Sequence, residues 1–209
     1  MKEPTIFRYF ADPMCSWCWG FTGSFEAIRN RFKDDFRFAL VMGGLRPYTE
    51  EPVTDAFREE ILHHWRDVQK MTGQDFSFEQ AMPEGFVYDT EPPARAVLSA
   101  GRLDPELGFE VFKAIQHGFY VDQIDVTQTE ALAQLVTEHE IGYQDFIDLF
   151  ASDEMRALVQ QHFIQTRKFG VRGFPTLAIG QEENPTIITS GYQPFTSIEG
   201  KIQNWLDTQ

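Results

Sequence analysis

Cysteine is scarce in this sequence: of its 209 residues, two are cysteines, Cys15 and Cys18. Their C-x-x-C spacing could supply half of a zinc site, which needs four ligands. The other ligands would have to be histidines, and no two of these show the H-x3-5-H spacing of a zinc site. The five histidines are His63, His64, His117, His139 and His162. We therefore expect no metal site, and the pair is either redox-active or an inert part of the core.

Basic residues are also few, with 18 lysines and arginines against 32 acidic residues and a formal net charge of −14. Nucleic acid and anionic membranes would repel such a chain, so we expect neither as a partner. Apolar runs long enough to span a membrane are absent, and residues 1–4 lack the pattern of a secretion signal. We therefore expect a cytoplasmic protein, in which a pair cycling between dithiol and disulfide is favoured over a structural disulfide.

Hydrophobic and aromatic residues are plentiful by contrast, at 42% and 14% of the chain. At this length they are enough for one sizeable core, or for one domain that carries a large insertion. No repeat or low-complexity segment interrupts the chain. The composition therefore predicts an ordered globular protein.

The C-x-x-C pair lies where a strand pattern gives way to a helix pattern. The segment 5–10 is β-branched and aromatic, and apolar residues then recur at helical spacing from Phe21 through Phe32. The first turn of a helix has free N–H groups and the positive end of the helix dipole, and both favour a thiolate. Cys15 is placed to benefit, while Cys18 falls on the buried stripe. We expect Cys15 to be the attacking thiol and Cys18 the resolving one.

The rest of the chain predicts a second strand, a helical block, a hairpin and a final helix. The second strand is 36–42, and the hairpin pairs 177–179 with 186–189 across a polar turn at 181–185. Candidate helix starts are Pro92-Pro93, Pro105, capping boxes that begin at Thr127 and Thr196, and an N-cap at Ser152. Candidate helix stops are Gly101, Gly142 and Gly170. The region from Gly73 to Pro93 reads as loop.

Several motifs in this order resemble the DsbA family of the thioredoxin superfamily, and most of all its FrnE-like cytoplasmic branch. They are Asp12-Pro13-Met14 before Cys15-Ser16-Trp17-Cys18, Glu91-Pro92-Pro93-Ala94-Arg95-Ala96-Val97, Phe119-Tyr120-Val121-Asp122, and Gly170-Val171-Arg172-Gly173-Phe174-Pro175-Thr176. The resemblance implies an α/β, thioredoxin-like fold, β-α-β then β-β-α, with a large all-helical insertion between its halves. Residues 1–45 and 170–209 would form the thioredoxin-like domain and 46–169 the helical insertion domain.

The resemblance also implies site residues. Cys15, Cys18 and Pro175 would be catalytic, with Pro175 in the cis form. Two departures matter: the central dipeptide is Ser16-Trp17 and not the Pro-His of strongly oxidising members, and the bulky Phe174 precedes Pro175. The direction of electron flow is therefore not inherited with the fold. Glutathione-dependent transferases and isomerases of this group carry serine at the first cysteine position, so Cys15 argues against that branch.

Aromatic and sulfur-containing side chains near the motif suggest a surface for flexible polypeptide. The candidate substrate-binding residues are Met14, Trp17, Phe174 and Thr176. Asp12 and Glu26 are candidate proton carriers for Cys18, although we favour solvated or capping roles for both.

The predicted function is that of a thiol-disulfide oxidoreductase, reductase-like or isomerase-like, on protein or peptide disulfides. It needs no cofactor, although glutathione or a thioredoxin-type partner could exchange electrons with it. The alternatives are a DsbA-like adaptor with regulatory cysteines and a glutathione-linked enzyme for small molecules. The sequence leaves the physiological substrate, the redox partner and the oligomeric state open.

Overall fold

The computed structural model describes residues 5–181 and 184–208. The N-terminal residues 1–4 and part of the predicted turn at 181–185 therefore lie outside the described residues. The strands are β1 (Ile6–Ala11), β2 (Arg37–Met42), β3 (Thr176–Ile179) and β4 (Thr186–Ser190). The helices are α1 (Ser16–Phe32), α2 (Asp55–Thr72), α3 (Glu91–Leu103), α4 (Gly108–Tyr120), α5 (Thr129–Thr137), α6 (Tyr143–Phe150), α7 (Asp153–Lys168) and α8 (Phe195–Asp207).

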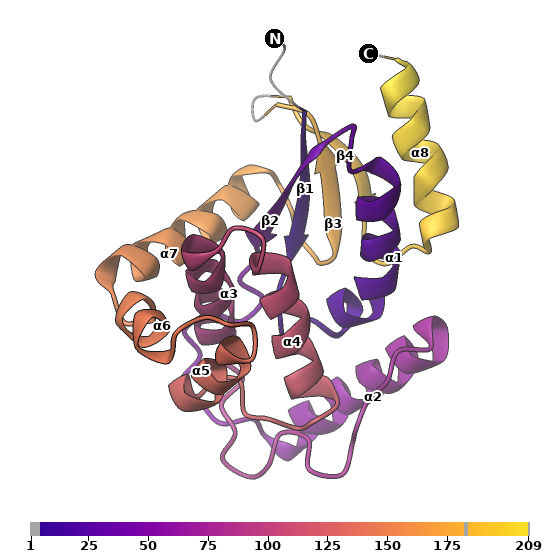
Figure 1. Ribbon diagram of the computed structural model, residues 1–209. Helices are drawn as coiled ribbons and strands as arrows, with labels where there is room; N and C mark the ends of the chain where they lie inside the picture. The colour runs from indigo at the N-terminus through magenta and orange to yellow at the C-terminus, as the bar shows by residue number, and fades with distance from the viewer. Residues whose placement is uncertain (1–4, 182–183, 209) are drawn as a thin grey trace.

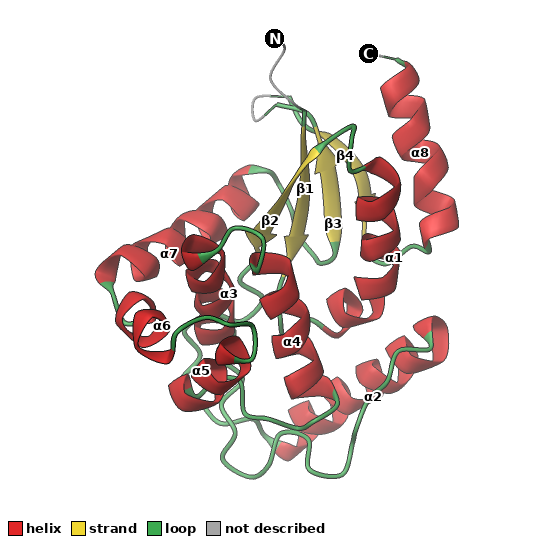
Figure 2. Cartoon of the chain, viewed as in Figure 1, coloured by secondary structure: helices red, strands yellow, loops and turns green. Residues whose placement is uncertain are grey.

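The four strands form one sheet in the order β2-β1-β3-β4 (Figures 1 and 2). β1 pairs parallel with β2, as a strand-helix-strand crossover requires. It pairs antiparallel with β3, and β3 pairs antiparallel with β4 across a register shift between Leu177 and Ala178. The predicted order, β-α-β and then β-β-α, is confirmed, and so is the hairpin.

Successive residues of β1 point to opposite faces of the sheet, and each face has its own apolar cover. Phe7, Tyr9 and Ala11 join the large core that includes the buried stripe of α1. Phe10 packs instead with Val41 and with residues that follow α7. Figure 1 shows α1 and α8 on one side of the sheet and α7 on the other. The sheet is thus covered on both faces, and a short loop joins the end of β1 to the start of α1.

Several predicted helix ends differ from the structure because local hydrogen bonds compete with the motifs. The helix expected from Pro105 begins at Gly108, since a turn held by Asp104 comes first. The hydroxyl of Thr127 bonds the Asp125 carboxylate, so α5 starts after Gln128 without a side-chain cap. Gly142 is the N-cap of α6, and α5 has already ended at Thr137.

The other predicted ends give a mixed result. α8 starts at Phe195, before the expected cap at Thr196. α3 begins at Glu91 and ends beyond Gly101, at Leu103. The prediction at the start of α7 is confirmed, because the Ser152 hydroxyl accepts a hydrogen bond from the Met155 N–H.

Six helices, α2 to α7, separate β2 from β3 among the described residues. They share one continuous core with the sheet and α1. Tyr9 of β1 meets Phe112 of α4 edge to face at 6.0 Å, and Trp19 of α1 stacks on Tyr120 of α4 at 6.1 Å. The division into a thioredoxin-like domain and an insertion domain stays a prediction.

Candidate active site

The two cysteines lie at the start of α1, and both are buried. Cys15 is the N-cap residue, in extended conformation, and its carbonyl accepts the N–H of Cys18 at 2.9 Å and of Trp19 at 3.1 Å. Its side chain retains a little solvent contact, since the residue is 6% exposed, whereas Cys18 is fully buried. Both are free thiols. Of the pair, only Cys15 can be reached by a disulfide from outside.

The Cys18 thiol strongly favours its protonated form. Burial raises the pKa of its thiol well above the ordinary value, and the neighbouring Cys15 raises it further. A hydrogen bond from the backbone of Asp12 acts in the opposite direction but does not outweigh burial. A resolving cysteine in this position must therefore lose its proton during the reaction.

The loop before β3 closes over the cysteine pair from the far end of the chain. The peptide bond between Phe174 and Pro175 is cis, as the family resemblance implied. The Cys15 thiol points at the Phe174 carbonyl oxygen, 3.7 Å away, although 159 residues separate the two. The backbone just before Pro175 therefore faces the Cys15 sulfur.

A cleft of about 370 Å³ opens beside Cys15, and we call it the Cys15 cleft. Its walls come from α1, α2 and the loops after β2 and before β3. The apolar lining residues are Met14, Trp17, Leu45, Phe57, Ile61, Trp65, Tyr88 and Phe174, and the charged or titratable ones are Arg46, Glu60 and His64. Such a largely apolar cleft with a few polar groups is typical of a binding site.

Three of the four candidate substrate-binding residues line this cleft, and one does not. Met14 lines it although its side chain is fully buried, and Trp17 and Phe174 are half-buried there. Thr176 is buried within β3 and donates its hydroxyl to the Gly173 carbonyl at 2.8 Å. It is not among the residues of the Cys15 cleft. Through this hydrogen bond, Thr176 helps to hold the backbone of the cis-proline loop.

Asp12 is fully buried beneath the motif, so the expected solvated role is wrong. The expected capping role is wrong as well, because the N-cap of α1 is Cys15 and no side chain caps that helix. Its carboxylate accepts the N–H of Met14 at 3.0 Å and of Leu45 at 2.8 Å. Burial raises its pKa to about 6, while hydrogen bonds, including one from Thr90, lower it. Asp12 thus ties the C-x-x-C loop to the loop after β2.

Glu26 lies on the surface side of α1, where its carboxylate accepts a hydrogen bond from the Lys113 ammonium. Its side chain is 45% exposed. Its ion-pair partner is Lys113, and within the described residues it makes no hydrogen bond with Cys18, so a direct proton transfer between the two has no geometric support. Glu26 is better described as half of a surface ion pair between α1 and α4.

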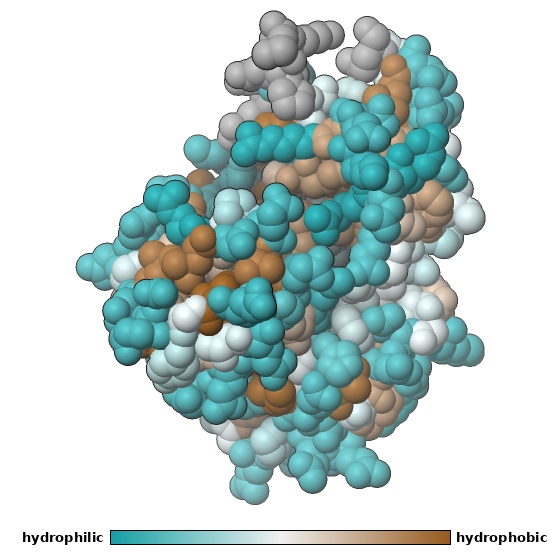
Figure 3. Space-filling view, viewed as in Figure 1, coloured by the Kyte–Doolittle hydropathy of each residue, from teal (hydrophilic) through white to brown (hydrophobic). Residues whose placement is uncertain are grey.

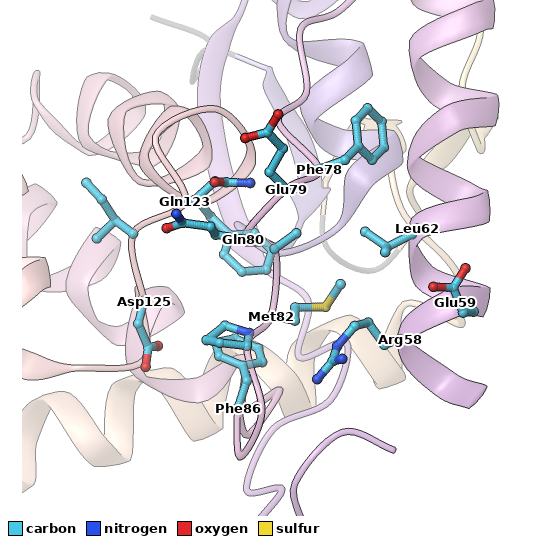
Figure 4. A pocket seen from close by; sticks show the side chains of 14 residues that line it. Arg58, Glu59, Leu62, Phe78, Glu79, Gln80, Met82, Phe86, Gln123 and Asp125 are labelled. Atoms are coloured by element: carbon cyan, nitrogen blue, oxygen red, sulfur yellow. The ribbon is translucent and has the colours of Figure 1, made fainter. Parts of the chain in front are cut away.

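A second and larger hollow, of about 590 Å³, lies on the other side of α2 (Figure 4). Leu62 and Arg58 of α2 line it together with Met82 and Phe86 of the long loop. None of its lining residues belongs to the C-x-x-C motif or the cis-proline loop. The larger hollow therefore does not share the chemistry of the Cys15 cleft. The surface seen in Figure 3 is mainly hydrophilic, with hydrophobic side chains in separate groups.

Within the residues that the structure covers, no group of three or more His, Cys, Asp or Glu side chains could hold a metal ion. Across the same residues, no helix is both long enough and apolar enough to cross a membrane. Both statements hold for residues 5–181 and 184–208.

Sequence reasoning missed the residues that the helical block contributes to the cleft. Phe57, Ile61 and His64 come from one face of α2, and Tyr88 from the loop before α3 donates its hydroxyl to the Met14 carbonyl. The helical spacing of Phe57 and Ile61 is a signal of burial, but it does not say which neighbour the two side chains meet. Gly43 was also missed: a Cβ atom built there would lie 2.2 Å from the Phe174 ring.

A thioredoxin-like sheet, a C-x-x-C pair at the start of the first helix and a cis-proline loop facing it define a class of protein, the thiol-disulfide oxidoreductases. The model of the family described as "DSBA-like thioredoxin domain" matches residues 7–203. The chain belongs to this family. No curated protein matches it by sequence.

Solved structures give the same picture. The "putative protein disulfide isomerase" from Nitrosomonas europaea is 39% identical, with a TM-score of 0.94 over 99% of this chain and 100% of that one. The cytosolic disulfide reductase DsbM from Pseudomonas aeruginosa, solved with GSH, is 25% identical, with a TM-score of 0.78 over 97% of this chain and 99% of that one.

Proposed function

We propose that this chain is a cytoplasmic thiol-disulfide oxidoreductase that reduces or isomerises disulfides of proteins or peptides. The observation that carries the proposal is the asymmetry of the pair: Cys15 opens on an apolar cleft and Cys18 is fully buried behind it. A thiol that lines a cleft and attacks, next to a fully buried thiol that resolves, is the arrangement that two-step disulfide exchange needs.

In the first step the Cys15 thiolate attacks one sulfur of a substrate disulfide and the other sulfur leaves as a thiolate. The N-terminus of α1 supplies the favourable end of the helix dipole to the attacking sulfur. In the second step the Cys18 sulfur attacks Cys15, the Cys15-to-substrate bond breaks, and the substrate is released reduced. The Cys15–Cys18 disulfide then has to be reduced again.

The lining of the cleft supports a polypeptide substrate. Trp17, Phe57 and Phe174 offer aromatic surface to apolar side chains. The backbone just before Pro175 faces the sulfur, where an extended peptide could pair with it. Met14, with a flexible thioether, adds an adaptable wall.

Two observations support reduction in the cytoplasm. Position 17 holds an uncharged tryptophan, which offers a thiolate less stabilisation than a cationic side chain would. The relative from P. aeruginosa is named a cytosolic disulfide reductase and was solved with GSH. We therefore propose glutathione as the reductant of the Cys15–Cys18 disulfide, with a thioredoxin-type protein as the other candidate. No metal or nucleotide cofactor is part of the proposal.

Three proteins test the proposal: the wild type, Cys15→Ser and Cys18→Ser. Each is mixed with a disulfide-bonded peptide and followed by mass spectrometry. We expect turnover by the wild type with glutathione, no adduct on Cys15→Ser, and a stable mixed disulfide on Cys15 of Cys18→Ser. A mixed disulfide that forms on Cys15→Ser but not on Cys18→Ser would reverse the roles of the two cysteines.

The wild type and the double variant Cys15→Ser, Cys18→Ser distinguish an enzyme from an adaptor. An adaptor would bind its partner in the wild type and in a Cys15→Ser, Cys18→Ser protein, and would turn over no disulfide. The equilibrium of the pair in glutathione buffers then fixes the direction of electron flow, because a tenfold change in that equilibrium corresponds to roughly 30 mV. A pair as oxidising as the periplasmic oxidants would contradict the reductase assignment.

A further inference from the structure

The larger hollow beside α2 has walls that the rest of the fold holds in place. Its volume of about 590 Å³ lies within the range of ligand-binding sites. The long loop between α2 and α3 is tied to the chain before α2, because the Val53 N–H donates to the Phe86 carbonyl at 2.8 Å. The same loop is tied to the end of α4, where the Ser77 N–H donates to the Tyr120 carbonyl at 2.8 Å. The shape of the hollow is therefore fixed by the fold itself.

Two hydrogen-bond donors in the lining of this hollow have no partner within the described residues. They are the Nε atom of Arg58 and the Nε2 atom of Gln123, and both atoms are buried. Buried polar atoms are nearly always paired in native proteins, so two unpaired donors at one cavity need an explanation. The Arg58 guanidinium is held at its other end, where Nη1 donates to the Asp55 carboxylate at 3.3 Å. In Figure 4 the Arg58 side chain reaches from α2 toward Met82 and Phe86.

Two residues of the lining also have a backbone conformation that side chains rarely adopt. Met82 has a φ of 52° and Gln123 a φ of 60°, both in the left-handed region that favours glycine. The other two non-glycine residues with positive φ in the described chain, Tyr48 and Glu140, lie elsewhere. Strained backbone of this kind clusters at ligand sites, where the surrounding structure holds it in place. At Gln123 the strain coincides with one of the two unpaired donors.

The charges around the hollow narrow the chemical class of its ligand. The lining has Arg58 as its single basic residue against three carboxylates, Glu59, Glu79 and Asp125. An anionic acceptor, such as a phosphate or a free carboxylate, would be repelled by these three charges, whereas a neutral carbonyl would not. A basic group, by contrast, would be attracted to them. The two donors therefore favour a carbonyl oxygen, and the carboxylates favour a positive charge beside it.

We propose that the larger hollow binds a segment of polypeptide in which an apolar side chain lies next to a lysine or an arginine. Backbone carbonyls of the segment accept hydrogen bonds from Arg58 and Gln123. The apolar side chain packs on Met82 and Phe86, and the basic group lies near the carboxylates. A nucleotide would bring anionic charge, and an aliphatic amine would bring no acceptor. The site does not depend on the proposed function, because no residue of the C-x-x-C motif lines it.

Peptides without cysteine test the site in the full-length wild-type chain, since they cannot exchange disulfides. The probe is an acetylated and amidated pentapeptide of alternating leucine and lysine, and its binding is followed by the NMR signals of the backbone amides. We expect saturable shifts centred on Met82 and Gln123. Shifts centred on Trp17 and Phe174 would place the peptide in the Cys15 cleft and overturn the proposal, as would the absence of saturable binding.

Two further probes test the chemical class of the ligand. A matched pentapeptide of alternating leucine and glutamate should bind at least tenfold more weakly than the lysine peptide. Equal binding by the two peptides would overturn the inference from charge. Free leucine and free lysine should each bind at least tenfold more weakly than the peptide. Equal or tighter binding by either free amino acid would show that the hollow takes a small molecule and not polypeptide.

Two variants in different elements remove one donor each. Arg58→Met should weaken binding of the lysine peptide about tenfold, although the loss of a positive charge by itself would strengthen it. Gln123→Leu should also weaken binding about tenfold, and it should leave Tm at or above the wild-type value, because it removes a buried donor that lacks a partner. Far-ultraviolet circular dichroism checks the fold of each variant. Unchanged peptide affinity in both variants would overturn the proposal.

Arg66→Met is the matched control for the arginine variant. Arg66 lies on the same helix and over the Phe78 ring at 5.6 Å, but it is not part of the lining of the hollow. The substitution removes the same charge as Arg58→Met and leaves both donors in place. We expect peptide affinity within twofold of the wild type or tighter. A loss as large as that of Arg58→Met would show that the hydrogen bond from Arg58 is not what holds the peptide.

Discussion

Gly43 should be intolerant of a side chain because Phe174 occupies the space next to it. A Cβ atom at position 43 would lie 2.2 to 2.7 Å from three carbons of the Phe174 ring. Distances below 3.0 Å are not tolerated, so in Gly43→Ala either the ring or the backbone has to move. The N–H of Gly43 also donates to the Ala11 carbonyl at 2.7 Å, which holds the backbone in place. We therefore expect the ring to move.

The displaced ring loses contacts on one side and changes the Cys15 cleft on the other. Phe174 packs against the small cluster of Phe10, Val41 and Ala178 and also lines the cleft. Overpacking of this kind costs about 1–3 kcal/mol of unfolding free energy. For a chain of this size each kcal/mol lowers Tm by roughly 2–4 °C. The rate of reaction with an apolar disulfide peptide should fall as well, while a small hydrophilic disulfide should be affected less.

Gly173→Ala is the control for this prediction. It is also next to Phe174, but a Cβ atom there meets nothing within 4 Å and its φ is not positive. Chemical denaturation should place it within about 0.5 kcal/mol of the wild type. The double variant Gly43→Ala, Phe174→Ala should cost less than the sum of its single variants, because the methyl group then has space. Wild-type stability and wild-type peptide kinetics in Gly43→Ala would refute the steric argument.

Three further predictions concern charge and redox poise. Because burial raises the pKa of Asp12 to about 6 in the folded chain, this carboxyl group ionises at a lower pH in the unfolded chain than in the folded one. The protonated Asp12 side chain therefore stabilises the fold below about pH 4, and this contribution of about 3 kcal/mol is lost as the pH rises to about 6. Denaturation measured at several pH values should show the loss for the wild type but not for Asp12→Asn. Trp17→His should make the Cys15–Cys18 disulfide more oxidising, by roughly 30 mV for each tenfold change in the glutathione equilibrium, and an unchanged potential would show that other surroundings set it. Glu91→Gln should destabilise the protein by about 3–5 kcal/mol in urea titrations, since it leaves the Arg95 guanidinium buried without its anion, whereas a loss below about 1 kcal/mol would contradict this.

Local pattern was enough for the parts of the fold that depend on neighbours in sequence. The burial of the stripe from Cys18 to Phe32 follows from helical spacing, and the Ser152 cap follows from one side chain and the next turn. The predicted cis form of Pro175 came from the family resemblance and not from periodicity. Where local signals conflicted, as at Thr127 beside Asp125, the sequence offered two hydrogen bonds and could not rank them.

The amino-acid sequence by itself determined the chemistry of this protein: two thiols one helical turn apart at the end of a strand. Only the tertiary structure decided what surrounds them. The Phe174 carbonyl reaches Cys15 across 159 residues, and α2 supplies a wall of the cleft. Periodicity records that a residue is buried but not against what, because the partner is chosen by packing between distant elements.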